Sequence, residues 1–187
     1  MHHGNGSTLQ AIIDNIKNGN LKAKINLVVS DNKDAFALER AEKSNIETYI
    51  INGKSKEEID IELDSILKNY DIDLIVLAGY LKMIGLRLIN KYTIINTHPS
   101  LLPKYGGKGM FGMNVHRAVI EAGEKISGPT VHFVNEKYDE GDIISQTEVK
   151  IEKEDTPESL AKKVQDVEKI QLVRVLKNFI EENSNNI

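Results

Sequence analysis

The run 73-DLIVLAG-79 limits the possible folds of this chain more than any other feature. Its continuous apolar character is typical of a parallel strand that is covered on both faces. Apolar residues at three- and four-residue spacing predict helices on either side of it, in 9–16, in 59–70 and near 81–92. Strands that alternate with helices predict an α/β fold, with an open, mostly parallel twisted sheet and helices on both faces.

The remaining elements follow the same alternation. Ser7 or Thr8 is expected to cap the first helix and Gly19 to end it, while Ser55 and Glu58 have the spacing of a capping box. Further strands are predicted at 23–30, 46–51, 93–98, 129–135 and 142–151, and further helices at 35–44, at 114–122 and from Thr156 and Pro157 onward. Because the chain carries no internal repeat and no low-complexity linker, we expect a single domain over 1–187.

Composition excludes several classes of protein. The 187 residues include no cysteine, so neither a disulfide framework nor a thiolate metal site can form. A net charge of −4 without a long basic block disfavours a nucleic-acid partner. No apolar run reaches the ~20 residues that span a bilayer, and the start lacks the regions of a secretion signal. We therefore expect a cytoplasmic protein without a membrane partner.

A possible catalytic pair stands at the end of a predicted strand, in 94-IINTHPSLLPKY-105. Residues i and i+2 of a strand point to the same side, so Asn96 and His98 face one volume while Thr97 faces away. Pro99 cannot donate to the sheet and ends the strand, at the sheet edge where α/β sites lie. An amide there can stabilise an oxyanion and an imidazole can transfer a proton, although a structural histidine that caps a turn fits the same spacing.

The motif 4-GNGS-7 has the character of an anion-binding loop, because glycines expose backbone N–H groups at the start of a helix. A plain helix-entry turn is the alternative. A glycine-rich loop of this kind normally follows a strand, and none precedes it in the sequence. A sheet without that first strand would expose unpaired backbone and apolar surface, so we expect reduced stability or activity for a chain with this start.

Other polar residues permit two interpretations each. Asp139 precedes Glu140 and Gly141 in a predicted loop, where it can orient an imidazole or simply belong to a turn. His132 is interpreted as a packed strand histidine and His116 as a surface or structural residue. The histidines lack the spacing of metal ligands, so we expect no metal site. The glycine-rich segment 105–112 is either a mobile lid or an ordinary surface loop.

Taken together and in this order, the motifs resemble those of the folate-dependent formyltransferases that act on glycinamide ribonucleotide. The residues that carry the resemblance extend from Gly4 to about Val175. They are 4-GNGSTLQAIID-14, 30-SDNKDAFALERA-41, 75-IVLAGYLKMI-84, 95-INTHPSLLPKY-105, 130-TVHFVNEKYDEGDII-144 and 164-VQDVE-168. The resemblance implies a Rossmann-like fold whose first strand is missing from the sequence. It also implies 10-formyltetrahydrofolate as formyl donor, glycinamide ribonucleotide as acceptor, a role in purine (IMP) biosynthesis, and a monomer or homodimer.

The resemblance implies three sets of site residues. The catalytic trio is Asn96, His98 and Asp139. Residues expected to bind the nucleotide are Gly6, Ser7, Thr8, Gln165, Asp166, Val167 and Glu168, with Thr8 where the family often has asparagine. Residues expected to bind the folate are Lys56, Leu81, Lys82, Met83, Ile84, Asn96, Asn135, Glu136, Lys137, Tyr138 and Asp139, with Lys56 near a position that is often arginine.

By the same resemblance, the nucleotide's amine attacks the formyl carbon on folate N10. Asn96 and protonated His98 stabilise the oxyanion, and Asp139 supports the imidazolium and a water that relays the proton. Three alternatives remain open. The acceptor could be methionyl-tRNA or a nucleotide sugar, the enzyme could be a formyltetrahydrofolate hydrolase, or the chain could bind nucleotide or folate without catalysis.

Overall fold

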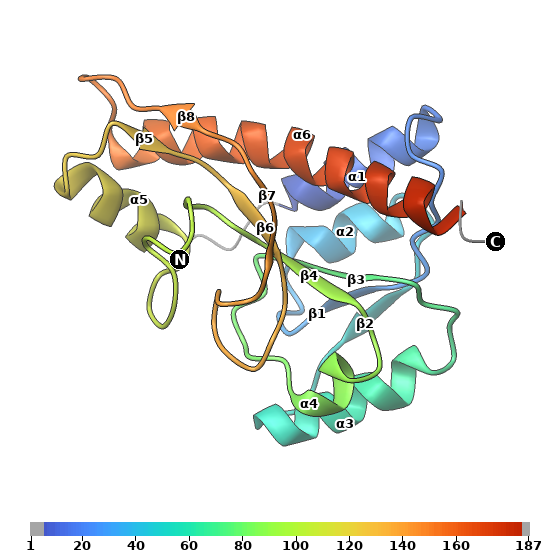
Figure 1. Ribbon diagram of the computed structural model, residues 1–187. Coiled ribbons are helices and arrows are strands. Elements are labelled where there is room, and N and C mark those ends of the chain that lie inside the picture. Colours follow the sequence, from blue (N-terminus) through green and yellow to red (C-terminus); the bar gives the residue numbers. More distant parts are fainter. Residues whose placement is uncertain (1–5, 185–187) are drawn as a thin grey trace. The chain divides into compact units, whose positions relative to one another are not determined.

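The computed structural model describes residues 6–184, so Gly4 and Asn5 of the glycine-rich motif lie outside the described residues. The chain divides into two compact units, 1–94 and 95–187. The first contains α1 (Ser7–Lys17), β1 (Val28–Ser30), α2 (Phe36–Glu42), β2 (Thr48–Ile50), α3 (Lys56–Leu67), β3 (Ile75–Ala78) and α4 (Leu86–Ile89). Strand β4 (Ile94–His98) begins at the boundary. The second unit continues with α5 (Met113–Glu121), β5 (Ile126–Ser127), β6 (Thr130–Phe133), β7 (Ile143–Gln146), β8 (Val149–Lys150) and α6 (Pro157–Ser184) (Figure 1).

Helix α1 begins at a glycine and not at a hydroxyl cap. Its N-cap is Gly6, with φ of 66°, and no side chain caps the helix, so the expected cap at Ser7 or Thr8 is wrong. A Cβ on Gly6 would lie only 2.9 Å from the backbone nitrogen of Ala37. Helix α2 therefore packs so close to Gly6 that no other residue fits at this position. The predicted end is confirmed, since Gly19 has φ of 77° and its N–H donates to Ile16 O at 3.1 Å.

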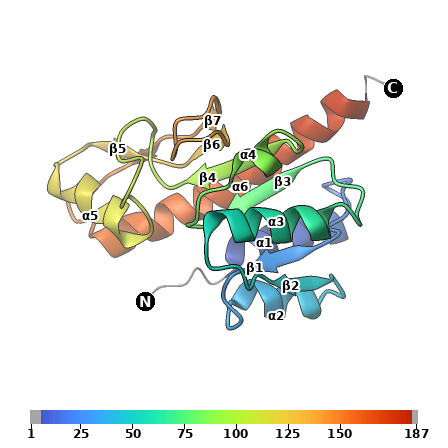
Figure 2. The same ribbon diagram turned by 90° about the horizontal axis from the view of Figure 1, so that it is seen from below.

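The first unit places two short parallel strands beside α2 (Figure 2). Val28 pairs with Thr48 and Ser30 with Ile50, so the strand predicted over 23–30 forms only in its last three residues. Among the described residues β1 pairs with β2 alone, and β3 belongs to a different sheet. No residue of β1 or β3 is fully buried, which differs from the covered strands that continuous apolar runs predict.

Helix α3 begins where the sequence predicts. Glu58 N–H donates to Ser55 Oγ at 3.1 Å and Ser55 N–H donates to Glu58 Oε2 at 3.2 Å, which confirms the capping box. The segment after β3 differs from its prediction, because only Leu86–Ile89 of the helix expected near 81–92 is helical. Gly85 precedes this turn, and its N–H donates to the buried Asp60 carboxylate at 2.9 Å. This side-chain bond holds 81–85 as irregular backbone.

The second unit is antiparallel. Ile95 pairs with Phe133 and His98 with Thr130 across β4 and β6, and β7 continues the sheet on the other side of β6. The strand predicted over 142–151 divides in two, since β7 pairs with β6 whereas β8 pairs with β5. Helix α6 begins at the predicted Pro157 and runs beside these strands (Figure 1). Leu160 and Val164 of α6 form a buried hydrophobic cluster with Val115 and Val119 of α5 and Val149 of β8.

The first unit alternates strands with helices, as the predicted α/β class requires, whereas the second unit has four successive strands, β5 to β8, between α5 and α6. Within residues 6–184, no helix is both long enough and apolar enough to cross a bilayer. The active-site candidates of the second unit depend on β4 and on the hairpin that connects β6 to β7.

Candidate active site

The pair Asn96 and His98 lies at the carboxyl end of β4, as predicted. Strand pairing places Asn96 opposite His132 and His98 opposite Thr130 on β6. The strand ends at His98, immediately before Pro99, which lacks the N–H that a further pair would need. His98 is buried and Asn96 is half-buried, so the strand end presents both polar groups at one place with little access to water.

Asp139 meets His98 from the hairpin between β6 and β7. Its Oδ2 lies 3.4 Å from His98 Nδ1 and accepts the N–H of Gly107 at 2.8 Å. The other ring nitrogen, His98 Nε2, lies 2.8 Å from Tyr105 O. A carbonyl can only accept, so Nε2 carries the proton and the lone pair of Nδ1 faces the carboxylate in the neutral ring. The structure thus brings the predicted catalytic trio together.

Burial and nearby charges set the protonation of this pair. Burial lowers the pKa of His98, and the Asp139 carboxylate and the Tyr105 carbonyl only partly counter this effect. Burial alone would raise the pKa of Asp139, but contacts with His132 and His98 and the N–H of Gly107 outweigh it and lower that pKa. Near neutral pH the resting site therefore combines a neutral imidazole with an ionised carboxylate, which differs from the protonated His98 that the resemblance implies. A proton that reaches Nδ1 creates an ion pair with Asp139.

A second histidine, His132, belongs to the same group of side chains. It is buried in β6 as predicted, yet its Nε2 lies 3.2 Å from Asn96 Nδ2 and 3.6 Å from Asp139 Oδ1. The second distance is too long for a hydrogen bond, so that contact is electrostatic. The sequence interpretation as a packing residue missed these contacts, because the pairing of β4 with β6 was not predicted. Only six residues separate His132 from Asp139, and this short spacing is a signal that could have suggested a shared hairpin.

A buried polar network fixes the chain that follows β4. Thr130 Oγ1 donates to Ser100 O at 2.6 Å and accepts the N–H of Leu102 at 3.1 Å, while Gln146 Nε2 donates to Leu102 O at 2.9 Å. Ser100 Oγ donates to Lys104 O at 2.6 Å. These bonds hold the turn that carries the Tyr105 carbonyl to the ring of His98.

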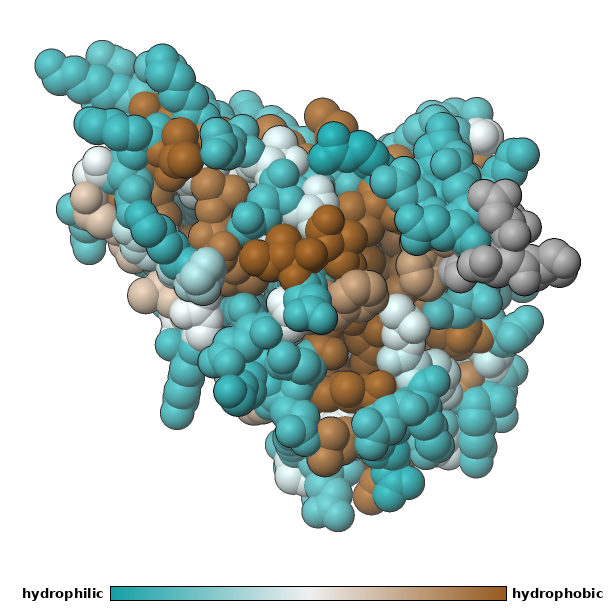
Figure 3. Space-filling model, viewed as in Figure 1, coloured by the Kyte–Doolittle hydropathy of each residue, from teal (hydrophilic) through white to brown (hydrophobic). Residues whose placement is uncertain are grey.

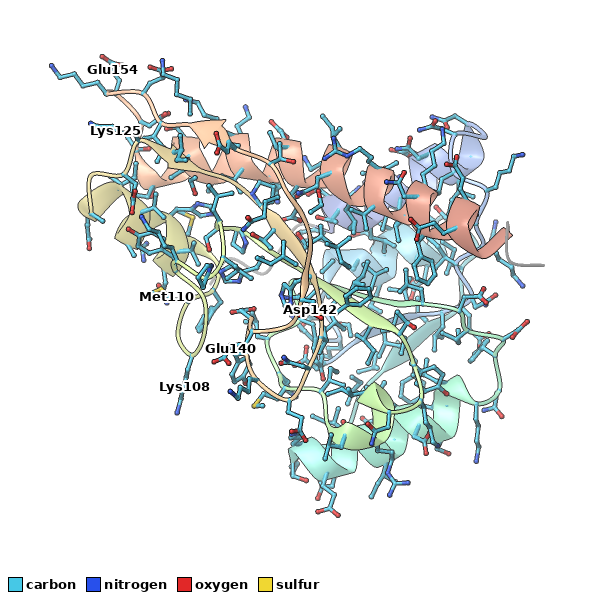
Figure 4. All side chains as sticks on the ribbon, viewed as in Figure 1. Lys108, Met110, Lys125, Glu140, Asp142 and Glu154 are labelled. Atoms are coloured by element: carbon cyan, nitrogen blue, oxygen red, sulfur yellow. The ribbon has the colours of Figure 1, made fainter. Side chains whose placement is uncertain are left out.

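The glycine-rich segment 105–112 touches the site through its backbone. Gly107, Gly109 and Gly112 have positive φ, which favours glycine at these three positions, and Tyr105 also has positive φ. Tyr105 O contacts His98 and the N–H of Gly107 donates to Asp139, whereas Lys108 points outward from the segment (Figure 4). The interpretation of this segment as a mobile lid stays a prediction.

His116 is buried on α5, so its interpretation as a surface residue is wrong and the structural one is left. Its side chain is only 5% exposed and Nδ1 has no hydrogen-bond partner among the described residues. Burial, with a smaller effect from His98, lowers the pKa of His116 to about 4. His116 is therefore neutral at physiological pH.

The other predicted site residues lie in their own units. In the first unit, Gly6, Ser7 and Thr8 form the start of α1, Lys56 begins α3, and Leu81, Lys82, Met83 and Ile84 connect β3 to α4. In the second unit, Asn135, Glu136, Lys137 and Tyr138 lie in the hairpin that carries Asp139, and Gln165, Asp166, Val167 and Glu168 lie on α6. Lys82 pairs with Asp31 at 3.2 Å. Within residues 6–184 no three potential ligands group closely enough to hold a metal.

Hydrophobic residues gather over β6 and β7 (Figure 3). Phe133 and Ile143 are 41% and 49% exposed, and Tyr138 in the connecting hairpin is 39% exposed. An apolar surface beside a few convergent polar groups is typical of a small-molecule site.

Comparisons with known proteins agree with this chemistry. Residues 1–176 match the formyl transferase family. The chloroplastic phosphoribosylglycinamide formyltransferase of Arabidopsis thaliana is 40% identical over 185 residues, covering 96% of this chain and 63% of that protein. The phosphoribosylglycinamide formyltransferase of Haemophilus influenzae is 38% identical over 183 residues, covering 95% of this chain and 84% of that protein. The crystal structure of glycinamide ribonucleotide transformylase 1 from Symbiobacterium toebii superposes with a TM-score of 0.88 at 33% identity, covering 96% of this chain and 84% of that chain.

The chain belongs to the formyl transferase family. The relatives reported above are, within that family, phosphoribosylglycinamide formyltransferases, so the resemblance predicted from the motifs is confirmed. The predicted fold class, an open α/β sheet, is confirmed by the structural match. This chain spans about three fifths of its plant relatives, 63% of the Arabidopsis thaliana protein and 59% of the chloroplastic phosphoribosylglycinamide formyltransferase of Vigna unguiculata.

Proposed function

We propose that the protein transfers a formyl group from 10-formyltetrahydrofolate to the amine of glycinamide ribonucleotide, a step of purine biosynthesis. The observation that carries the proposal is the meeting of Asn96, His98 and Asp139, with His98 Nδ1 3.4 Å from the carboxylate. Neither a serine nor a cysteine nucleophile is needed, since the substrate amine is itself the nucleophile. The names of the relatives support the same acceptor.

The proposed chemistry starts with attack of the amine nitrogen on the formyl carbon. The carbonyl electron pair moves to oxygen, and an N–H of Asn96 donates to that oxyanion. The proton that leaves the amine passes to His98 Nδ1, where Asp139 stabilises the imidazolium. The same proton then reaches N10 as the bond from carbon to N10 breaks, which returns the imidazole to its neutral form.

The remaining predicted residues have binding roles in the proposal. For the nucleotide phosphate we propose the backbone N–H groups of Gly6, Ser7 and Thr8, where the positive end of α1 favours an anion. For the rest of the nucleotide we propose Gln165–Glu168. For the folate we propose Lys56, Leu81–Ile84, Asn96 and Asn135–Asp139. Leu81 is 57% exposed and Tyr138 39% exposed, so each offers apolar surface to a pterin ring.

Both units, taken as the single predicted domain 1–187, are proposed to be required, since the family match extends over 1–176. A monomer or homodimer and a cytoplasmic location stay predictions. Sedimentation of the purified chain measures the first, and fractionation of the source cells measures the second.

A formyl-transfer assay tests the proposal directly. The purified chain is mixed with 10-formyltetrahydrofolate and glycinamide ribonucleotide, and the loss of the formyl group from folate is followed together with formation of the formylated nucleotide. Matched reactions contain methionyl-tRNA, an amino-sugar nucleotide or water alone. Transfer to the ribonucleotide alone supports the proposal. Transfer to another acceptor, hydrolysis in water, or binding without turnover refutes it.

A further inference from the structure

His132 is a buried titratable group of the site that the proposed reaction does not use. Its side chain is 3% exposed, and it stands directly opposite Asn96 in the pairing of β4 with β6. A register shift between Val131 and His132 interrupts the pairing of β6 with β7 at this residue. Gly141 also lies close to the ring, since a Cβ added to it would be 3.5 Å from His132 Nδ1. The ring is therefore confined at a fixed place beside the amide.

The backbone determines which nitrogen of His132 carries hydrogen. Nδ1 lies 2.8 Å from Phe133 O, and a carbonyl oxygen can only accept. Nδ1 is therefore the donor, and Nε2 of the neutral ring presents its lone pair. This is the opposite tautomer from that of His98, whose Nε2 donates to Tyr105 O.

The lone pair of His132 meets the amide of Asn96. Nε2 lies 3.2 Å from Asn96 Nδ2, so one amide N–H donates to it. This bond decides which end of the amide is nitrogen, and it leaves the second N–H for another acceptor. A proton on Nε2 would remove the acceptor of the Asn96 N–H. Nε2 would then interact with Asp139 Oδ1, which lies 3.6 Å away.

We propose that His132, as its neutral Nδ1–H tautomer, is a positioning residue that holds the Asn96 amide with its second N–H directed at the formyl oxygen. The inference rests on the proposed function and assigns His132 a role that acts through Asn96. Without this acceptor the amide can rotate, and its oxygen would then face the developing oxyanion and repel it.

Two substitutions of similar size separate this role from packing. Glutamine can place its amide oxygen near the position of Nε2, whereas asparagine reaches only the position of Nδ1. We expect His132→Gln to keep kcat within about threefold, and His132→Asn to lower kcat about tenfold with little change in KM for the nucleotide, the size expected for one lost hydrogen bond. Equal losses of kcat in the two variants would overturn the inference.

A double-substitution cycle tests whether His132 acts through Asn96. In the Asn96→Ala background the amide is gone, so His132→Asn should cause no further loss of kcat. A purely structural role would lower kcat by the same factor in both backgrounds, and that result overturns the inference.

Nitrogen-15 NMR gives a readout that does not depend on turnover. In the wild-type chain we expect a protonated Nδ1 and an unprotonated Nε2 at His132, together with two inequivalent Asn96 amide protons of which one shifts in His132→Asn. A protonated Nε2, or an Asn96 amide that is unchanged in the variant, overturns the inference. If these signals are found in a chain that transfers no formyl group, the inference about position stands and the proposed function fails.

Discussion

The buried His116 should make the stability of the protein depend on pH in a measurable way. Its pKa is about 4 in the folded chain and 6.5 when unperturbed. Between these values the unfolded chain binds a proton that the folded chain does not, so stability is complete above pH 6.5 and falls as pH decreases toward 4. At about 1.4 kcal/mol per pH unit, neutral His116 contributes about 3 kcal/mol to the free energy of unfolding, of which about 2 kcal/mol is lost by pH 5.

Urea unfolding of the wild-type chain and of His116→Leu at pH 7.5 and pH 5 measures this contribution. All other groups titrate in both proteins, so the difference between the two pH dependences isolates His116. Leucine also removes the unpaired Nδ1, so the variant is expected to fold at neutral pH. The wild-type chain should lose about 2 kcal/mol more than the variant between the two pH values. Equal losses in the two proteins would refute the reasoning.

Three further perturbations test other parts of the structure. Asn96→Ala should lower turnover about 10²–10³-fold, and Asp139→Asn should also slow turnover much more than it weakens nucleotide binding, so an effect on affinity alone in steady-state and binding assays contradicts the site. Gly85→Ala should destabilise the chain by about 2 kcal/mol in urea unfolding, because its Cβ would lie 1.5 Å from Asp60 Oδ2 and displace a buried carboxylate from its donor.

Local sequence patterns predicted the elements that depend on local interactions. The capping box at Ser55, the end of α1 at Gly19 and the long helix from Pro157 follow from propensities and hydrogen bonds within a few residues. The strand of 23–30 was predicted too long. A strand needs a partner along its length, and β2 provides one for only three residues.

The predictions failed where distant side chains decide the backbone. The segment after β3 has the apolar spacing of a helix, but the buried Asp60 accepts the N–H of Gly85 and delays the helix until Leu86. His132 was interpreted as a packing residue for a similar reason. Its contact with Asn96 depends on the antiparallel register of β4 and β6, which periodicity within one strand cannot reveal.

Three buried histidines of the second unit differ in what their ring nitrogens face, and this difference assigns their roles. Nδ1 of His98 faces the ionised Asp139, so a proton on it gains an ion pair and the ring can take part in proton transfer. Nε2 of His132 accepts from the Asn96 amide, so the same proton would cost that ring its hydrogen bond. His116 has no carboxylate partner among the described residues, and its pKa of about 4 keeps it neutral near pH 7. Asp139 lies near the rings of both His98 and His132, so the Asn96 amide on His132 Nε2, and not the carboxylate alone, distinguishes the ring proposed to carry the transferred proton.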